Sequence, residues 1–238
     1  MKKLFYKIIN FLYPLTCSVC GDNLSYLSHI NICDKCKKSL PAINGLVCQK
    51  CGAQLPDGGE YCYICRKYPK EYSFDKMRSV YLYKDSLRNL ILKFKYSNRI
   101  FLAKNFGQVM YETMQIYNFY SNADFIIPVP LNIIRKIKRG YNQAELLANE
   151  ISSASNIPVL NNVLLRKKIT KPQFKLSKNE RLKNIKGSFL IKNSNIVHSK
   201  NILLVDDIAT TSATVSACSS ALKKAGSKEV YVLTLARD

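Results

Sequence analysis

From about residue 72 onward, helical hydrophobic patterns alternate with short apolar runs. The helical patterns, with apolar side chains at every third or fourth position, cover residues 86–95, 102–117, 143–153 and 212–225. The apolar runs, each suited to one buried strand, cover residues 79–83, 125–129, 202–205 and 230–235. This alternation predicts an α/β domain with a mostly parallel sheet over residues 71–238.

Residues 17–65 lack this periodicity and consist largely of cysteines, turn-forming glycines and polar residues. A segment so poor in core-forming side chains needs a source of stability other than hydrophobic burial, and bound metal is the obvious one. We therefore expect a small metal-binding module at residues 17–70, ahead of the α/β domain.

Residues 1–16 predict an amphipathic helix, because five apolar side chains share one helical face: Leu4, Phe5, Ile8, Ile9 and Leu12. We expect this face to pack on the rest of the protein, with attachment to a membrane surface as the alternative. No signal-peptide cleavage site follows, and no apolar stretch approaches the ~20 residues that span a bilayer. These features predict a cytoplasmic protein without stable membrane insertion.

Eight of the nine cysteines lie in four C-x-x-C pairs, separated by ten to twelve residues. Zinc prefers four tetrahedral ligands, and each pair presents two thiolates from one tight turn. The simplest pairing is sequential, with one zinc on Cys17, Cys20, Cys33 and Cys36 and a second on Cys48, Cys51, Cys62 and Cys65. An interleaved pairing uses the same residues and stays open.

Zinc fits this cysteine pattern better than its two competitors. A catalytic dithiol needs one C-x-x-C rather than four in series, and iron–sulfur motifs have tighter cysteine runs. Closed four-cysteine sites leave no open coordination position, so both zinc ions are expected to be structural. Paired thiols that bind metal also point to a reducing compartment.

The composition adds a strong basic charge, with 37 Lys and Arg against 16 Asp and Glu and a formal net charge of +21. Because 47% of the residues are hydrophobic, the chain is not a disordered polybasic tail. Such an excess favours polyanionic partners such as nucleic acid, nucleotides or anionic lipid.

The most specific candidate for a ligand-binding site follows the apolar run at 202–205. Asp206 and Asp207 stand at its carboxyl end, and small or hydroxyl residues then lead into a helix from Ser212. Open α/β sheets bind ligands at that end, where the N–H groups of a helix start can hold an anion. The two carboxylates repel phosphate but suit sugar hydroxyls, with magnesium balancing the charge. A core strand followed by a capped helix is the alternative, although capping needs only one such residue.

This segment resembles the signature of type I phosphoribosyltransferases, which bind phosphoribosyl pyrophosphate (PRPP) with magnesium. The resemblance implies a phosphoribosyltransferase-type, Rossmann-like sheet, with Asp206 and Asp207 on the ribose hydroxyls and residues 210–214 on the 5′-phosphate. The PRPP-binding residues expected on this basis are Asp206, Asp207, Ala209, Thr210, Thr211, Ser212, Ala213 and Thr214.

Further motifs extend the resemblance to nearly the whole chain. The four C-x-x-C pairs are followed by KFKY at 93–96, IPVPL at 127–131, RGYNQAEL at 139–146, TKPQ at 170–173, and Arg181 with Asn184 and Phe189. In this order they are similar to the ComF family, whose members resemble competence proteins of natural transformation. The resemblance implies a double zinc-ribbon module ahead of a phosphoribosyltransferase fold, but fold alone does not imply transferase activity.

Two positions depart from the related signatures. Ser212 replaces a usual glycine, so we expect its side chain to narrow the phosphate cradle. Thr210 stands where 6-oxopurine transferases resemble one another in having an acidic base, which argues against purine salvage by that mechanism.

The cations gather in three clusters. These are Lys93, Lys95 and Arg99; Arg135, Lys136, Lys138 and Arg139; and nine residues from Arg166 to Lys186 that include Lys168, Lys171, Lys175 and Arg181. By the transferase resemblance, a basic loop closes over pyrophosphate. A single-stranded DNA track is compatible with this, with Tyr96, Tyr141 and Phe174 for base stacking. Solvated surface lysines are the remaining alternative.

We therefore expect a zinc-containing protein that binds PRPP with magnesium and handles single-stranded DNA during competence. The alternative is an active phosphoribosyltransferase that transfers phosphoribose to a nucleobase or amine and releases pyrophosphate. The sequence offers no obvious general base for that reaction. A third hypothesis, which the resemblance admits, makes the zinc module a docking platform for a DNA helicase or translocase.

Overall fold

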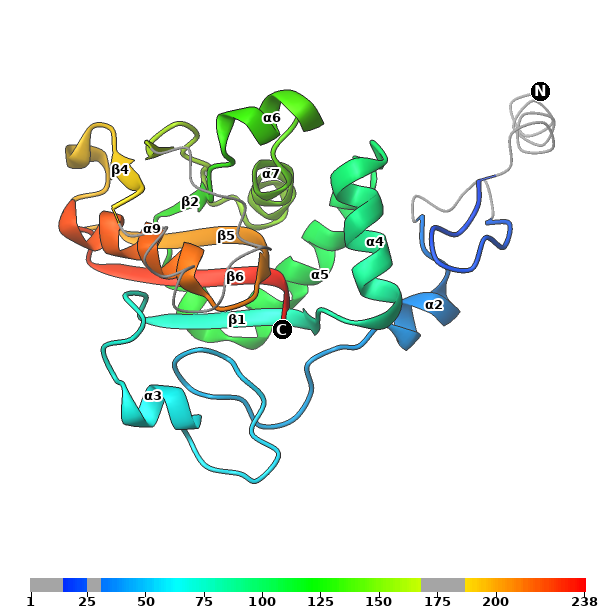
Figure 1. Cartoon of the computed structure of the whole chain (residues 1–238), viewed down its shortest axis with the longest axis horizontal. Helices are drawn as coiled ribbons and strands as arrows, with labels where there is room; N and C mark the ends of the chain where they lie inside the picture. The colour runs from blue at the N-terminus through cyan, green and yellow to red at the C-terminus, as the bar shows by residue number, and fades with distance from the viewer. Residues whose placement is uncertain (1–14, 25–30, 168–186) are drawn as a thin grey trace.

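Four parallel strands form the central sheet of the computed structural model, which describes residues 15–24, 31–167 and 187–238. Their order is β1 (Lys76–Leu82), β6 (Glu229–Arg237), β5 (Asn201–Ala209) and β2 (Phe125–Pro128) (Figure 1). Each strand overlaps a predicted apolar run, and the predicted mostly parallel sheet is confirmed. A short antiparallel pair, β3 (Leu164–Arg166) and β4 (Phe189–Ile191), was not expected. Most of the helix expected at 1–16 lies outside the described residues.

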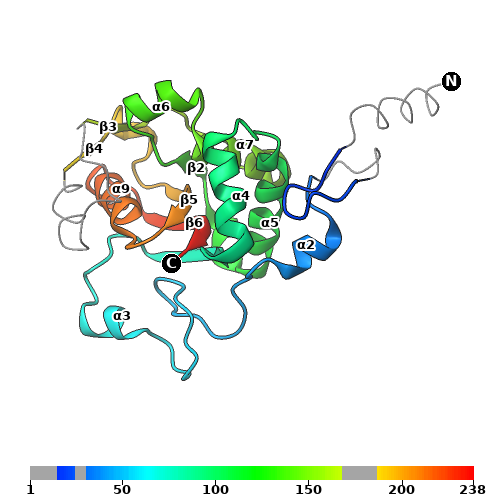
Figure 2. The same cartoon turned by 45° about the vertical axis from the view of Figure 1, so that its right-hand side comes forward.

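Helices cover both faces of the sheet. Figure 2 shows α4 (Asp85–Tyr96), α5 (Leu102–Ile116) and α7 (Gln143–Ser155) on one side and α9 (Ala213–Lys224) on the other. These four helices were predicted from hydrophobic periodicity and are confirmed. The shorter elements are α2 (Asp34–Ser39), α3 (Tyr63–Lys67), α6 (Ile133–Arg139) and the 3-10 turns η1 (Asn118–Asn122) and η3 (Ser194–Ile196).

The β5 strand divides its apolar side chains between two cores, as alternation along a strand requires. Leu203 and Val205 join the core with α4, α5 and α7, whereas Ile202 and Leu204 join the core with α9. All four side chains are fully buried, as expected for a parallel strand whose two faces are both covered.

The cysteine segment consists of two copies of one small unit. In each copy the first cysteine of the first pair donates its N–H to a carbonyl five residues on, from Cys17 to Asp22 (2.8 Å) and from Cys48 to Ala53 (2.7 Å). The second C-x-x-C of each copy begins a helix, because Cys33 and Cys62 are the N-caps of α2 and α3. The expectation that every pair forms a tight turn is therefore wrong for half of the pairs. We call residues 15–40 the first ribbon and residues 46–68 the second ribbon.

The two ribbons pack into cores on opposite faces of the sheet. Cys17, Ile32 and Leu40 of the first ribbon share a core with α4 and α5. Cys48 and Cys51 of the second ribbon share the other core with α9. In Figures 1 and 2 α2 accordingly lies beside α4, whereas α3 lies away from it below the sheet.

The segment between the ribbons covers the exposed edge of β1. The Leu82 N–H donates to the Pro41 carbonyl (2.8 Å), and the Ile43 N–H donates to the Val80 carbonyl (2.9 Å). An uncovered edge strand invites pairing with other chains, so this cover protects the sheet.

Two buried arginines attach the second ribbon to the sheet. The Arg78 guanidinium of β1 donates to the Cys48 and Gln49 carbonyls at 3.3 and 3.2 Å, and Arg237 of β6 donates to the Cys51 carbonyl. Charge-assisted bonds of this kind are stronger than neutral ones, and their loss would leave buried charge unpaired. The second ribbon is thus an integral layer of the fold.

Among the described residues, no helix combines the length and the apolar composition that crossing a lipid bilayer requires.

Gly52 tests the docking of the second ribbon, because an added Cβ would lie 2.7 Å from the Met77 carbonyl oxygen. Gly58 is a matched control in the same ribbon, since its φ is also positive (82° against 68°) and its Cβ would meet nothing within 4 Å. In both variants the alanine must adopt a left-handed backbone conformation, which lowers the free energy of unfolding by about 1 kcal/mol. We expect Gly52→Ala to lose at least about 1 kcal/mol more in urea unfolding of the zinc-loaded protein. Equal losses would show that the contact with β1 contributes nothing.

Candidate functional site

The four sulfurs of each ribbon lie close enough to bind one metal ion. Within each set, Cys17, Cys20, Cys33 and Cys36 or Cys48, Cys51, Cys62 and Cys65, all Sγ atoms lie within 4.8 Å of one another. A tetrahedral site with Zn–S bonds of about 2.3 Å places its sulfurs about 3.8 Å apart. The Cys20–Cys33 and Cys51–Cys62 sulfurs are 3.9 and 3.6 Å apart. The two tetrads are therefore consistent with two zinc sites, and the pairing is sequential rather than interleaved.

Backbone N–H groups prepare one thiolate in each tetrad. Burial raises the pKa of Cys17, but N–H bonds, led by that from Cys33 (3.3 Å), outweigh burial and lower the pKa to about 6. Cys48 shows the same balance: burial raises its pKa, but the N–H groups of Cys51, Cys62 and Lys50 lower it to about 7. Since zinc binds the deprotonated thiolate, both shifts favour metal binding.

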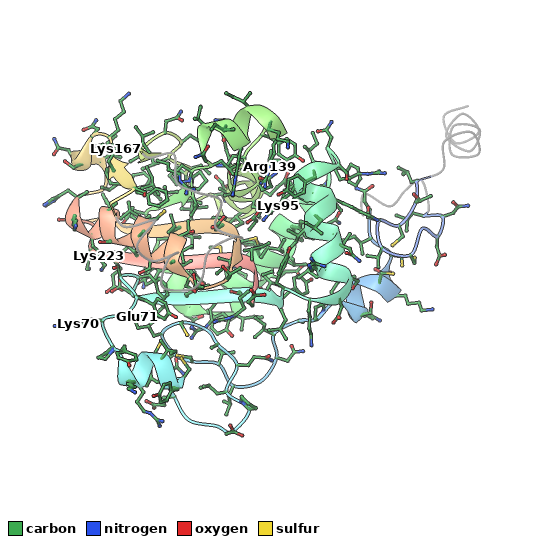
Figure 3. All side chains as sticks on the ribbon, in the orientation of Figure 1. Lys70, Glu71, Lys95, Arg139, Lys167 and Lys223 are labelled. Atoms are coloured by element: carbon green, nitrogen blue, oxygen red, sulfur yellow. The ribbon has the colours of Figure 1, made fainter. Side chains whose placement is uncertain are left out.

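A pocket of about 510 Å³ opens at the carboxyl ends of β2 and β5. Cations and two carboxylates line it together with polar and aromatic side chains. The charged lining residues are Lys95, Arg135, Lys138, Arg139, Arg166, Asp206 and Asp207. Figure 3 shows Lys95 and Arg139 in the space between α4 and α6. This is the edge at which open α/β sheets bind ligands, and five cations against two carboxylates suit a highly anionic one.

The carboxyl end of β5 holds the two adjacent aspartates in different states. Burial and the neighbouring charge of Asp207 raise the pKa of Asp206 to about 8. Its Oδ1 accepts the N–H of Asp207 at 2.8 Å. Asp207 instead pairs with Lys95, whose Nζ lies 2.8 Å from Asp207 Oδ2. Asp206 therefore keeps its proton near neutral pH, which eases the repulsion between the two neighbouring carboxylates.

The last turn of α4 connects three parts of the protein. Lys93 donates to the Ser18 carbonyl of the first ribbon (2.7 Å), Lys95 pairs with Asp207, and the Tyr96 hydroxyl accepts a bond from Arg139 (2.9 Å). Phe94, between them, is fully buried in the core. Lys93 was predicted to contact phosphate, but it is used at the ribbon and does not line the pocket.

The RGYNQ block at 139–143 builds the pocket wall. Gly140 ends α6 with φ 79°, in the left-handed region that favours glycine. Asn142 caps α7 by accepting the Ala144 N–H and donates to the Val129 carbonyl at 3.1 Å. Arg139 donates to Gln143 at 2.9 Å and lies 4.7 Å from the centre of the Tyr96 ring. The block thus fixes where α6 ends, where α7 begins and how Arg139 lies in the pocket.

The segment between β5 and α9 forms the remaining wall. Thr210 and Thr214 line the pocket, whereas Ala209, Thr211, Ser212 and Ala213 do not. Ser212 has φ 57°, which explains why related signatures favour glycine there. Its buried hydroxyl donates to Met77 Sδ (3.8 Å). The expectation that this side chain narrows the phosphate cradle is therefore wrong, because it points at β1.

The predicted site residues thus fall into three groups. Pocket-lining residues are Lys95, Arg135, Arg139, Asp206, Asp207, Thr210 and Thr214. Predicted residues elsewhere in the described structure are Lys93, Ala209, Thr211, Ser212 and Ala213. Lys168, Lys171, Lys175 and Arg181 lie outside the described residues.

Several pocket residues were not predicted individually as site residues. Asn142, Gln143 and Tyr83 line the pocket, and so do Lys138 and Arg166, which were predicted only as members of the basic clusters. Asn142 and Gln143 belong to the RGYNQ motif at 139–143, so their place in that motif could have identified them as site residues. Arg166 lies on the short strand β3, which the hydrophobic pattern of the sequence did not predict. Among the described lining residues, Asp206 and Asp207 are the only carboxylates, so a third acidic group for base catalysis is absent there.

Comparisons with known proteins agree with this two-part organisation. Residues 8–66 match the double zinc ribbon domain family, and residues 113–238 match the phosphoribosyl transferase domain family. The chain is 33% identical over 234 residues to competence protein F from Haemophilus influenzae, covering 97% of this chain and 100% of that protein. It is 27% identical to DNA utilization protein YhgH from Escherichia coli, covering 94% and 97%.

Among solved structures, the chain is similar to glutamine PRPP amidotransferase from B. subtilis complexed with ADP and GMP, with 19% identity and a TM-score of 0.42. That similarity covers 60% of this chain and 30% of the amidotransferase chain.

The raised pKa of Asp206 predicts a stability that falls with pH. The folded state keeps a proton up to about pH 8 that the unfolded state releases near pH 4, so stability is lost between these values. Asp206→Asn removes this loss and keeps an oxygen to accept the Asp207 N–H. We expect the variant to gain more than about 1 kcal/mol over the wild type between pH 5.5 and pH 8.5 in urea unfolding.

Asp124→Asn is the matched control for this measurement. The Asn201 N–H (2.8 Å) and Lys200 lower the pKa of Asp124, so its stabilising charge is complete above pH 5 and is lost only in acid. The control should lose the same stability at pH 5.5 and pH 8.5. A pH-independent effect of Asp206→Asn as well would contradict the raised pKa.

Proposed function

This chain belongs to the ComF family of double-zinc-ribbon proteins with a phosphoribosyltransferase domain, and we propose that it binds magnesium–PRPP and handles single-stranded DNA in the cytoplasm during natural transformation. One observation carries the proposal: a pocket at the carboxyl end of β5 joins the aspartate pair to five cations. PRPP combines a diol with two highly charged phosphate groups, and this pocket offers partners for both. The names of two relatives, competence protein F and DNA utilization protein, support the DNA part.

In the proposed complex, Asp206 and Asp207 accept hydrogen bonds from the ribose hydroxyls. Thr210 and Thr214, at the start of α9, hold the 5′-phosphate, since the N-terminus of a helix attracts anions. Arg135, Lys138 and Arg166 neutralise the pyrophosphate. Magnesium bound with PRPP would supply further positive charge beside the aspartates.

Lys95 has a distinct role in this proposal. Its ammonium lies 2.8 Å from Asp207 Oδ2 and would share that carboxylate with a ribose hydroxyl in the complex. The partial burial of both side chains keeps their attraction stronger than that of a surface ion pair. Lys95 thus lets an acidic pair persist in a pocket for anions.

Transferase activity is the second candidate, because the family shares its fold with enzymes that act on PRPP. The attacked atom would be the ribose carbon that bears pyrophosphate, with the leaving group neutralised by the pocket cations. The described lining residues supply no acidic base beyond the ribose-binding pair, so an acceptor would have to be nucleophilic without deprotonation by a third carboxylate.

PRPP with magnesium is expected to raise the melting temperature of the protein. At a hundredfold excess over Kd the ligand stabilises by about 2.7 kcal/mol, or roughly 5–10 °C. The double substitution Asp206→Asn with Asp207→Asn should abolish the shift, whereas Asp124→Asn, at the opposite end of β5, should retain it. Differential scanning fluorimetry measures all three proteins. An unchanged wild-type melting temperature would remove the PRPP assignment.

Single-stranded DNA binding is expected to weaken steeply with salt, because each neutralised phosphate contributes about −0.7 to the slope of log K against log salt. Arg135→Gln with Lys138→Gln should therefore lower the slope by about 1.4, measured by anisotropy of a labelled oligo-dT. Neutralising Lys168, Lys171 and Lys175 together should lower it by about 2.1. Lys104→Gln on α5 is the control, and a wild-type affinity insensitive to salt would exclude the DNA track.

A further inference from the structure

The outer surface of the second ribbon carries three exposed tyrosines that the pocket does not use. Tyr61, Tyr63 and Tyr68 are 48%, 58% and 49% exposed, although most large aromatic side chains of the described chain are buried or half-buried. Nearby Tyr72 differs, because its ring stacks on Phe74 (5.0 Å between centroids) and contributes to packing. The three exposed rings therefore need an explanation other than stability.

Basic side chains lie among these tyrosine rings. Lys67 donates to the Tyr63 hydroxyl at 2.8 Å, and its Nζ lies 5.3 and 5.5 Å from the centres of the Tyr63 and Tyr68 rings. Residues 61–70 also contain Arg66 and Lys70, and the acids Glu60 and Glu71 stand directly before and after this stretch. Figure 3 shows Lys70 extending away from the body of the protein near α3. We call Tyr61, Tyr63, Arg66, Lys67 and Tyr68 the tyrosine surface.

The zinc site and the sheet hold this surface in place. The helix α3 begins at the zinc-ligand position Cys62 and carries Cys65, which is buried in the core shared with α9. The ribbon beneath it is bound to β1 and β6 through Arg78 and Arg237. Rings on such a scaffold lose little further conformational entropy when a partner binds.

The first ribbon provides an internal comparison. Its α2 occupies the same place after the third cysteine and carries Lys37 and Lys38 where α3 carries Arg66 and Lys67. It has Asp34 and Ser39 at the positions of Tyr63 and Tyr68. The aromatic side chains are thus specific to the second ribbon and are not required by the fold of the repeat.

We propose that the tyrosine surface of the second ribbon is a stacking site for bases of single-stranded nucleic acid, separate from the PRPP pocket. Bases stack on exposed aromatic faces without regard to sequence, and interleaved cations hold the backbone phosphates. A protein partner would also use tyrosine, but the three cations of residues 61–70 outnumber the two flanking acids, and Lys67 lies among the rings, which favours a polyanion. This inference rests on the proposed handling of single-stranded DNA and names a contact surface for it.

The chain contains no tryptophan, so one introduced indole reports on its own surroundings. We would compare Tyr68→Trp in the second ribbon with Ser39→Trp at the equivalent place in the first. Saturation with oligo-dT should quench the fluorescence of Tyr68→Trp at least several-fold more than that of Ser39→Trp. Binding itself is followed in parallel by the anisotropy of a labelled oligonucleotide.

Affinity provides the second readout. Replacing Tyr61, Tyr63 and Tyr68 together by alanine should weaken oligo-dT binding about tenfold or more, because stacking contributes about 1–3 kcal/mol per base. Replacing all three by phenylalanine, which keeps the rings, should retain the wild-type affinity. Two zinc ions per chain and an unchanged PRPP-induced melting shift confirm that each variant is folded.

The outcomes separate this inference from the proposed function. Binding by anisotropy with equal quenching of both indoles, or with unchanged affinity of the alanine variant, would overturn the tyrosine surface and leave DNA handling intact. Absence of any oligonucleotide binding to the wild type would overturn both. Selective quenching together with rescue by phenylalanine would establish stacking at this surface.

Discussion

The ion pair between Lys95 and Asp207 is the interaction on which the site depends. Two neighbouring carboxylates at the end of a buried strand repel each other. The raised pKa of Asp206 and the ion pair of Asp207 with Lys95 both reduce this repulsion. That cation comes from the last turn of α4, so α4 must lie against the end of β5. The same turn contacts the first ribbon through Lys93 and the pocket wall through Tyr96.

The zinc ribbons contribute to this arrangement from both sides of the sheet. The first ribbon shares a core with α4 and α5 and accepts a bond from Lys93. The second ribbon is fixed by Arg78 and Arg237, and its neighbour Met77 accepts a hydrogen bond from Ser212 in the segment between β5 and α9. Metal bound at the two cysteine tetrads would therefore stabilise the walls of the pocket as well as the ribbons themselves.

Local residue spacing predicted the sheet, the four long helices and the two cysteine tetrads. Each of these features depends on how apolar or thiol side chains are spaced along the chain. It could not show that β5 runs on to Ala209 past Asp206 and Asp207, since these carboxylates break the apolar run. Nor could it show that Lys93 bonds to Ser18, 75 residues away, while Lys95 faces the pocket. Tyr83 and Gln143 likewise joined the site only through tertiary contacts between distant segments.

Calorimetric titration of the zinc-loaded protein with PRPP, ribose 5-phosphate and pyrophosphate, each with magnesium, tests the central claim most directly. If the aspartate pair and the cations form one site for a phosphorylated ribose bearing pyrophosphate, PRPP should bind at least about tenfold more tightly than either fragment. Pyrophosphate binding as tightly as PRPP would show a site for anions alone and would contradict the role given to Asp206 and Asp207.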